Sequence, residues 1–556
     1  MPTIEVSFKE LKNLSKLNFK KEKMQDVLLT YLKADVENMK GDKMSIKLED
    51  TNRPDLWCVE GLAKNLRNLF GKKSKNYKIK KSDIIVDIDK KLKDVRPYAA
   101  CAVVKNIKIS KNFLKSIIQF QEKLGKSYGR NREKVGLGVY DLDKMNGNKI
   151  KYKAAKPDEK FIPLEFKKEL SLKEILKKHP KGQEYAHLLK GKKMFPVFED
   201  ESKQILSMPP IINAHETGKV TEKSKNLFIE ATGTDFETVM HALNLFAMAF
   251  AEQNGEIYST KLKYNYKNEC GFEVSPKFDS KNFNIKSSYI DKILGLGLTS
   301  QEIKKLLIKM GYTVKKVDIS KDLITIEIPF YRKDVIHAVD IVEDVAIAYD
   351  YNKIKPLEPK VYTKGKLLEQ TEKYNNIREF MIGMKFQEVL NFTFTSKKNI
   401  FEKMNRKKGK ALEVIKPISS NYSHLRDSIL PMILDFFEKN KTVEFPQRIF
   451  ELGHVLIPDN KKCNKVKQQN NLCAAISHSK ATFTEIKSVL DTLAKQLNLK
   501  LKVKHKKHTS FISGRCGEIF LGRKSIGIIG EIHPRILRNF NLENPVCVLE
   551  LNVDLL

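Results

Sequence analysis

Long apolar runs are missing from this sequence, and its few cysteines are scattered. No window approaches about 18 consecutive apolar residues, so no membrane-spanning helix is expected. The opening MPTIEVSFKELKNL mixes charged and apolar residues and lacks the basic-then-apolar order of a secretion signal. The seven cysteines include no C-x-x-C pair, which argues against a zinc ribbon or a disulfide framework. We therefore expect a cytoplasmic chain with reduced thiols and no membrane partner.

Motifs of several common catalytic families are also missing. Gly125-Lys126-Ser127 lacks the upstream glycine of a phosphate-binding loop, and Gly295 and Gly297 have no third glycine. The sequence contains no H-E-x-x-H motif and no metal-ligand spacing of cysteine and histidine. These absences exclude the nucleotide-binding loops and zinc sites that such motifs identify.

Basic residues exceed acidic residues by a wide margin. The 103 lysines and arginines against 68 aspartates and glutamates give a formal charge of +35. A polyanionic partner such as a nucleic acid explains this excess. A compositional bias explains it equally well, because lysine greatly outnumbers arginine, the residue that contacts phosphate with two hydrogen bonds. Both explanations stay open.

The chain is long enough for roughly three to four domains, and we expect an α+β multidomain fold. The expected domains are an N-terminal α/β domain (1–90), a mixed α/β domain (94–265), a small domain (270–355) and a mostly antiparallel sheet with helices (360–556). Apolar residues predict a buried helix over 236–252. In the small domain, the spacing of a threonine and a glutamate, T-S-Q-E, predicts a capping box at the start of a helix.

A short sequence repeat, called the Arg-x-Asp echo below, is shared by the first and third domains. Arg53-x-Asp55 precedes VEGLA, and Arg332-x-Asp334 precedes VEDVA. The echo is consistent with a duplicated unit and also with chance, since both matches are short.

An acidic cluster stands out near the second copy of this motif. Asp340, Glu343 and Asp344 are spaced to share one face of a helix, and Asp334 lies just before it. Stacked like charges need a counter-charge. Mg²⁺ with oxygen ligands would supply one, and pairing with lysine or arginine would supply another. Spacing alone does not decide between them.

Two loops in the second domain combine rigidity with polar groups. MPPIIN (208–213) places two prolines at the entry of a loop, and ATGTD (231–235) is a tight turn that presents hydroxyls and a carboxylate at a strand end. Such turns also occur simply as connections between secondary-structure elements, with no functional role.

Eight segments in order resemble the phenylalanyl-tRNA synthetase beta subunits of the archaeal and eukaryotic type. They are DTNRPDLWCVEGLA, YGRNREKVGLGVYDLDKM, MPPIIN, ATGTD, IPFYRKDVIHAVDIVEDVAIAY, VIKPISSNYSHLRDSILPMIL, RIFELGHV and IGIIGEIHPRIL. The resemblance covers essentially the whole chain. It implies a heterotetramer of two alpha and two beta subunits that acts on tRNA-Phe, with ATP bound mainly by the alpha subunit. Residues 360–556 then resemble a class II synthetase catalytic fold that has lost its active site and forms a subunit interface.

The same resemblance implies roles for individual residues. Asp334, Asp340, Glu343 and Asp344 match the Mg²⁺-binding positions of the family, which favours the metal interpretation of the acidic cluster. Residues 94–265 resemble the editing domain, which hydrolyses tyrosine wrongly esterified to tRNA-Phe. A phenylalanine pocket rejects an added hydroxyl only modestly, whereas a second site that bonds the hydroxyl selects tyrosine strongly. The candidates for that second site are Asp235, Thr232 and Thr234, with Asn213 and Glu216 nearby, and Arg130 and Arg132 for the tRNA end.

A different class of function remains as the alternative. A standalone nucleic-acid-binding protein or Mg²⁺-dependent nuclease would use the positive charge and the acidic cluster directly. A nuclease normally draws its metal ligands from several elements around a cleft, whereas three of the four carboxylates here share one predicted helix. A stoichiometric partner subunit would distinguish the two.

Overall fold

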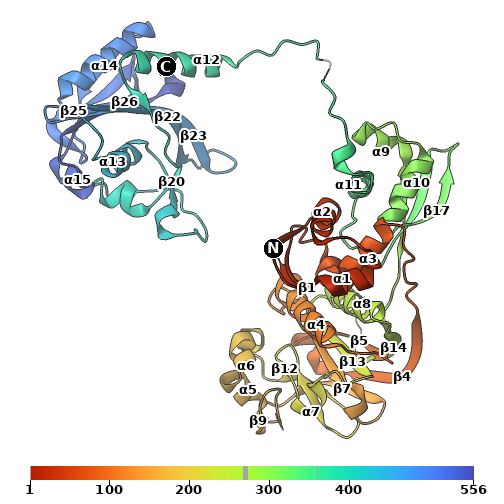
Figure 1. Ribbon diagram of the computed structural model, residues 1–556. Helices are drawn as coiled ribbons and strands as arrows, with labels where there is room; N and C mark the ends of the chain where they lie inside the picture. The colour runs from red at the N-terminus through yellow and green to blue at the C-terminus, as the bar shows by residue number, and fades with distance from the viewer. Residues whose placement is uncertain (1, 267–272, 360, 408) are drawn as a thin grey trace. The chain divides into compact units, whose positions relative to one another are not determined.

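The computed structural model of the chain forms two compact units, Met1–Glu358 and Pro359–Leu556 (Figure 1). It describes residues 2–266, 273–359, 361–407 and 409–556. Within these ranges, no helix is both long enough and apolar enough to cross a membrane.

The first part of the chain is a small three-stranded sheet with two helices. Its elements are β1 (Thr3–Ser7), α1 (Phe8–Ser15), α2 (Lys21–Leu32), β2 (Ala34–Lys40) and β3 (Lys43–Leu48), with the strand order β1-β3-β2. The amphipathic helix α3 (Val59–Leu69) follows after a turn that begins with Pro54. Trp57 is buried in the core that α3 shares with this sheet.

A larger sheet occupies the middle of the first unit. Its strands are β4 (Ile79–Ile88), β5 (Tyr98–Lys105), β6 (Gly136–Asp141), β7 (Lys149–Ala155), β10 (Phe195–Glu199), β11 (Ile205–Met208), β12 (Ile212–Asn213), β13 (Leu227–Gly233), β14 (Glu256–Tyr264) and β15 (Val274–Ser275). The order is β12-β11-β10-β7-β4-β14-β5-β13-β6, with β15 beside β14. Strand β4 lies inside the predicted N-terminal domain, yet it pairs with β14 and β7 of this sheet, so residues 79–88 belong to the middle domain.

Helices α4 (Lys111–Lys123) and α8 (Phe236–Glu252) cover one face of this sheet (Figure 1). Phe113 and Phe120 of α4 pack with Phe246 and Phe250 of α8 against alternate residues of β5 and β13. The apolar sequence 236–252 therefore forms the helix that its composition predicted. A small subdomain joins β7 to β10 and contains β8 (Lys160–Phe161), β9 (Leu170–Ser171), α5 (Leu172–Lys178) and α6 (Pro180–Tyr185). The short helix α7 (His215–Gly218) follows β12.

The last part of the first unit repeats the element order of the first part. It contains β16 (Lys281–Lys286), α9 (Ser287–Leu294), α10 (Ser300–Lys309), β17 (Thr313–Asp318), β18 (Leu323–Ile328) and then α11 (Ala338–Tyr349). Thr299 and Glu302 form the predicted capping box of α10, and Ile303, Leu306 and Leu307 of this helix are buried.

The second unit is a seven-stranded sheet with helices. Its elements are α12 (Glu369–Gly383), β19 (Gln387–Glu388), α13 (Leu430–Lys439), β22 (Gln447–Pro458), β23 (Val466–Ser477), α14 (Phe483–Gln496), β24 (Leu501–His505), β25 (Phe511–Leu521), β26 (Lys524–Ile532), α15 (Pro534–Asn539) and β27 (Val546–Asn552), with a separate pair of strands, β20 (Phe394–Thr395) and β21 (His424–Leu425). All pairs in the sheet are antiparallel except β19 with β22. The mostly antiparallel sheet predicted for this region is therefore present.

Candidate functional site

The middle sheet curls until its two end strands approach each other. Strands β12 and β6 are at opposite ends of the strand order, yet the Asn213 Nδ2 atom donates a hydrogen bond to the Val139 carbonyl at 3.0 Å. Near the same place, Arg132 Nη1 donates to the Pro210 and Ile211 carbonyls at 2.8 and 3.1 Å. A cavity of about 460 Å³ opens where the ends of the sheet meet.

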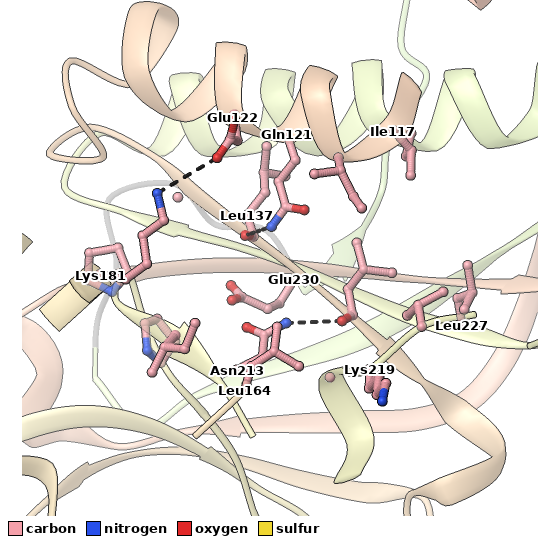
Figure 2. Close-up of a pocket in the computed structure, with 18 of the residues that line it drawn as sticks. Ile117, Gln121, Glu122, Leu137, Leu164, Lys181, Asn213, Lys219, Leu227 and Glu230 are labelled. Carbon is pink, nitrogen blue, oxygen red and sulfur yellow. Dashed lines mark hydrogen bonds and ion pairs between the residues drawn. The ribbon is translucent and has the colours of Figure 1, made fainter. Parts of the chain in front are cut away.

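The walls of the cavity are largely apolar, and a few polar side chains converge on it. The apolar residues that line it include Ile109, Phe113, Ile117, Leu137, Val139 and Ile211. Figure 2 shows Glu230 between Gln121 of α4 and Asn213 of β12. Lys181 of α6 lies at one side and pairs weakly with Glu122 at 3.7 Å. A largely apolar cavity with few fixed polar groups is typical of a small-molecule or side-chain pocket.

Glu230 is the most unusual group in the cavity. Its side chain extends from β13, next to the end strand β6, and is buried. Oε1 lies 3.2 Å from the Tyr140 hydroxyl, while Oε2 is buried without a hydrogen-bond partner among the described residues. Burial raises the pKa of Glu230 to about 8, although the nearby Arg96 guanidinium lowers it. An unpaired buried carboxyl oxygen is costly, so a ligand with a hydroxyl or amine would be bound favourably here.

The space beside Glu230 requires a glycine on the neighbouring strand. Gly138 lies opposite Glu230 in the β6–β13 pairing. A Cβ atom at this position would lie 2.6 Å from Glu230 Oε1 and 2.7 Å from the Tyr140 hydroxyl. A side chain here would displace the carboxyl group or the phenol, so Gly138 keeps this polar pair intact.

His215 contributes a second unpaired polar atom. The residue begins α7 and lines the same cavity as Glu230. Its Nδ1 is buried and has no hydrogen-bond partner in the described part of the chain. Two buried polar atoms without partners in the wall of one cavity indicate a site that is completed by a bound molecule or water.

The ATGTD turn does not contribute its side chains to this cavity. Thr232 is buried and accepts a hydrogen bond from Arg96 Nε at 2.9 Å, and Thr234 donates to the Glu133 carbonyl at 3.1 Å. Asp235 caps α8 by accepting from the Thr238 backbone N–H at 2.9 Å. Interaction with the Thr238 side chain is the main reason that the pKa of Asp235 is lowered, and the backbone hydrogen bond lowers it further. None of the three predicted residues is among the described residues that line the cavity.

Of the other four predicted residues of this domain, two line the cavity and two do not. Asn213 and Arg132 line the cavity. Arg132 also lies over the Tyr185 ring at 4.2 Å, so its guanidinium joins the MPPIIN loop to α6. Glu216 is exposed and accepts from Gln204 Nε2 at 3.0 Å, outside the cavity wall. Arg130 is exposed on a turn in which three consecutive residues have positive φ.

Two of the four predicted metal ligands are held by one arginine. Asp344 of α11 is buried and accepts from Arg332 Nη2 at 2.7 Å and from the Tyr312 hydroxyl at 2.5 Å. Asp334 accepts from Arg332 Nε and Nη2 at 2.7 to 3.1 Å. Both carboxylates therefore already have a positive partner.

The other two predicted ligands point elsewhere. Asp340 accepts from the backbone N–H groups of Ile336 and His337 at 2.8 and 2.7 Å, which caps α11. Glu343 pairs with Lys33 at 2.6 Å. Across the described ranges, no group of three or more histidine, cysteine, aspartate or glutamate side chains is arranged to hold a metal ion. In this arrangement the four carboxylates do not fit a magnesium site, and the magnesium assignment remains a prediction.

Sequence patterns pointed to the loops around the cavity but missed Glu230. Its signal is a single carboxylate within the apolar strand LFIEATG. Neither the neighbours of Glu230 nor its burial can be read from that string, because both depend on the pairing of β13 with β5 and β6. His215 carried no signal at all, since one histidine beside a turn is common.

Three known family models match this chain. The B3/4 domain matches residues 96–249, the tRNA synthetase B5 domain matches residues 283–351, and the phenylalanyl tRNA synthetase beta chain CLM domain matches residues 354–553. The cavity thus lies in the region similar to the B3/4 domain, and the acidic helix α11 lies in the region similar to the B5 domain.

Full-length relatives are also similar to this chain. The phenylalanine–tRNA ligase beta subunits of Pyrococcus abyssi and Pyrococcus horikoshii are 40% and 41% identical to it, and each alignment covers 99% of both chains. The crystal structure of an N-terminal fragment of the phenylalanyl-tRNA synthetase beta subunit from Pyrococcus horikoshii has a TM-score of 0.59 and 42% identity. It covers 63% of this chain and 99% of the fragment.

Proposed function

This chain belongs to the family of phenylalanine–tRNA ligase beta subunits, and we propose that its cavity beside Glu230 hydrolyses tyrosine wrongly attached to tRNA-Phe. As a family member it is a subunit of the ligase that attaches phenylalanine to its tRNA. The observation that carries the proposal is the buried, unpaired Oε2 of Glu230 in a largely apolar cavity.

The chemistry of this cavity suits tyrosine better than phenylalanine. Both side chains have an aromatic ring that the apolar walls can enclose, but only tyrosine brings a hydroxyl to Glu230. Phenylalanine would leave Glu230 Oε2 unpaired, at a cost of about 1–3 kcal/mol. That cost corresponds to roughly ten- to a hundred-fold discrimination against phenylalanine at this site.

A bound water is the nucleophile in this proposal. The described residues that line the cavity include no serine, threonine or cysteine that could attack the ester directly. The water oxygen attacks the ester carbon, the bond to the terminal ribose oxygen breaks, and that oxygen takes a proton. His215 Nδ1 has no hydrogen-bond partner among the described residues, and in this proposal it accepts the proton that the water loses. The products are free tyrosine and uncharged tRNA.

Positive side chains at the cavity suit the phosphates of a tRNA end. Lys181 and Lys219 line its wall together with Arg132. The Arg132 guanidinium is largely used by the Pro210 and Ile211 carbonyls, so in this proposal it positions the loop and Lys181 meets the phosphate backbone.

Deacylation of preformed Tyr-tRNA-Phe tests the proposal. The enzyme is the assembled complex of this chain with its alpha subunit, and the variant is Glu230→Ala. We expect deacylation to slow by roughly ten- to a hundred-fold, with little change in phenylalanine attachment because that reaction belongs to the other subunit. Glu216→Ala is the matched control, since this exposed glutamate is near in sequence but outside the cavity wall. Equal deacylation rates for Glu230→Ala and wild type would contradict the proposal.

The second unit is proposed as the main contact with the alpha subunit. Several large apolar side chains there are strongly exposed, namely Leu390, Phe392, Ile415 and Ile418, at 81, 75, 90 and 101% of their possible surface. Exposed apolar side chains on this scale are typical of a surface that another protein covers. We propose an assembly of two alpha and two beta subunits. A cytoplasmic location, where tRNA is charged, is part of the same proposal.

ATP and the Mg²⁺ that accompanies it are assigned to the alpha subunit in this proposal. The antiparallel sheet of the second unit would then be a class II synthetase fold without its nucleotide site. In support, the sheet residue Glu451 is buried and paired with Arg426 at 2.6 Å, while Asn391 donates to it at 2.8 Å. These groups therefore already have hydrogen-bond partners within the second unit. The alternative, a standalone nuclease, lacks support because its four carboxylates do not surround one point.

A further inference from the structure

The first and last parts of the first unit are two copies of one arrangement. Each has the element order strand-helix-helix-strand-strand, and in each sheet the last strand lies between the other two: β1-β3-β2 and β16-β18-β17. In each copy an Arg-x-Asp segment follows the last strand and leads to a helix, α3 or α11. Shared topology, together with the Arg-x-Asp echo, favours a duplicated unit over chance.

The two copies pack against each other reciprocally. Helix α2 of the first copy contacts α11 of the second, and α10 of the second contacts α3 of the first (Figure 1). Since α2 corresponds to α10 and α3 to α11, the same pair of surfaces is used twice. This is the pattern of a two-fold symmetric dimer, formed here within one chain. Gly311 marks the close approach, because a Cβ there would lie 2.7 Å from Asn68 Nδ2 of α3.

The two Arg-x-Asp segments meet in the interface between the copies. Within the first, Arg53 donates to both oxygens of Asp55 at 2.8 and 2.9 Å. Within the second, Arg332 binds Asp334 in the same two-pronged way. Arg53 Nε lies 3.9 Å from Asp334 Oδ1, which connects one copy to the other. All four side chains are at most 8% exposed.

Two further side chains complete this junction. Asp344 binds Arg332, and Lys64 Nζ lies 3.4 Å from Asp55 and over the Tyr331 ring at 2.9 Å. The junction thus has three basic and three acidic side chains, so its formal charge is balanced. A divalent cation would add two positive charges to a buried and already neutral cluster, which is unfavourable.

We infer that Asp334 and Asp344 belong to an ion-pair lock between two copies of a duplicated unit, and that Arg332 takes the place of a metal ion as their counter-charge. The lock has a mechanical consequence. The middle sheet, which holds the cavity, is inserted between the two copies, so fastening the copies together fixes both chain connections to that sheet. This inference does not depend on the proposed hydrolysis.

Magnesium binding decides between the lock and a metal site. Isothermal titration with MgCl₂ would be performed on the full chain alone and on its complex with the alpha subunit, without nucleotide, for wild type and Asp344→Asn. We expect no Mg²⁺ bound to the chain alone, and for the complex the same Mg²⁺ stoichiometry in wild type and variant. The inference would be overturned if, in either preparation, the wild type binds one Mg²⁺ per chain and Asp344→Asn does not bind it.

Thermal unfolding gives a second, independent measurement. We expect the wild-type unfolding temperature to be the same in EDTA and in millimolar Mg²⁺. Arg53→Gln and Asp334→Asn should each lower it, and the double variant should lose less than the sum of the two single losses, because the residues meet across the interface. The exposed pair Lys487 and Asp491 on α14 is the matched control, for which single losses should be small. Strict additivity for Arg53 and Asp334 would overturn the cross-copy lock.

Discussion

The Tyr140 hydroxyl lies 3.2 Å from Glu230 Oε1 and donates a hydrogen bond to Ser207 Oγ at 2.7 Å. This contact joins β6, β13 and β11, which are strands from both ends of the curled sheet. Tyr140→Phe removes the hydroxyl and leaves two buried polar groups short of a partner. We expect a loss of about 1–3 kcal/mol in the free energy of unfolding and slower deacylation of Tyr-tRNA-Phe.

Tyr152→Phe is the control for this prediction. Tyr152 is another buried tyrosine of the same sheet, and its hydroxyl donates to the Arg96 carbonyl at 3.1 Å. Both variants lose a buried hydrogen bond, but only Tyr140→Phe disturbs Glu230. If the two variants deacylate at the same rate, the Tyr140 contact has a structural role only.

The Glu230 carboxyl should make stability depend on pH. Its pKa is raised from an ordinary value of 4.5 to about 8, chiefly by burial. The folded state therefore holds this proton more tightly than the unfolded state. The stability that the bound proton contributes is fully present below pH 4.5 and is lost as the pH rises through about 8. As the pH rises from 4.5 to about 8, the free energy of unfolding of the wild type should therefore fall relative to that of Glu230→Gln. Urea unfolding at several pH values measures it, and a difference independent of pH would contradict the assignment.

His215→Phe should slow deacylation without unfolding the domain. Phenylalanine keeps a ring at the cavity wall but removes Nδ1, the atom proposed to accept the proton from water. Removing a general base typically costs about 10²–10⁴-fold in rate. His187→Phe is the control, since this histidine of the same domain is not among the residues that line the cavity. Single-turnover deacylation with unfolding temperatures in parallel provides the test, and a wild-type rate for His215→Phe would remove it from the reaction.

Asp235 should act as a helix cap. Asp235→Ala loses the hydrogen bond to the Thr238 N–H and should lower stability by about 0.5–2 kcal/mol, whereas Asn caps about as well as Asp. We expect Asp235→Asn to keep both stability and the deacylation rate. If Asp235→Asn is normally stable but deacylates slowly, the Asp235 carboxylate takes part in the hydrolysis, as the sequence predicted.

Charged residues in the exposed apolar surface of the second unit should prevent assembly. Leu390→Asp and Phe392→Asp change side chains that are 81 and 75% exposed, so the chain by itself should lose little stability. In the complex, each would bury an unpaired charge. Ile319→Asp is the control, because Ile319 is 72% exposed in the first unit. Co-expression with the alpha subunit and measurement of mass after size exclusion gives the result, and normal assembly of both variants would place the interface elsewhere.

Local patterns in the sequence determined many individual elements. The apolar run 236–252 forms α8, and Thr299 with Glu302 caps α10, because helix periodicity and capping depend on residues a few positions apart. The ordered motifs of the family likewise needed no structure to be recognised, and the full-length relatives confirm that identification.

Tertiary structure alone decided the partners of each group. Strand β4 joined the middle sheet because its pairing partners lie far along the chain. The one-face spacing of the α11 carboxylates did not reveal that Asp344 meets Arg332, whereas Asp340 caps the helix. Glu230 became the central group of the cavity only when the ends of the sheet met. Strand register and charge pairing are long-range properties, so the cavity and the ion-pair junction could not be read from local sequence.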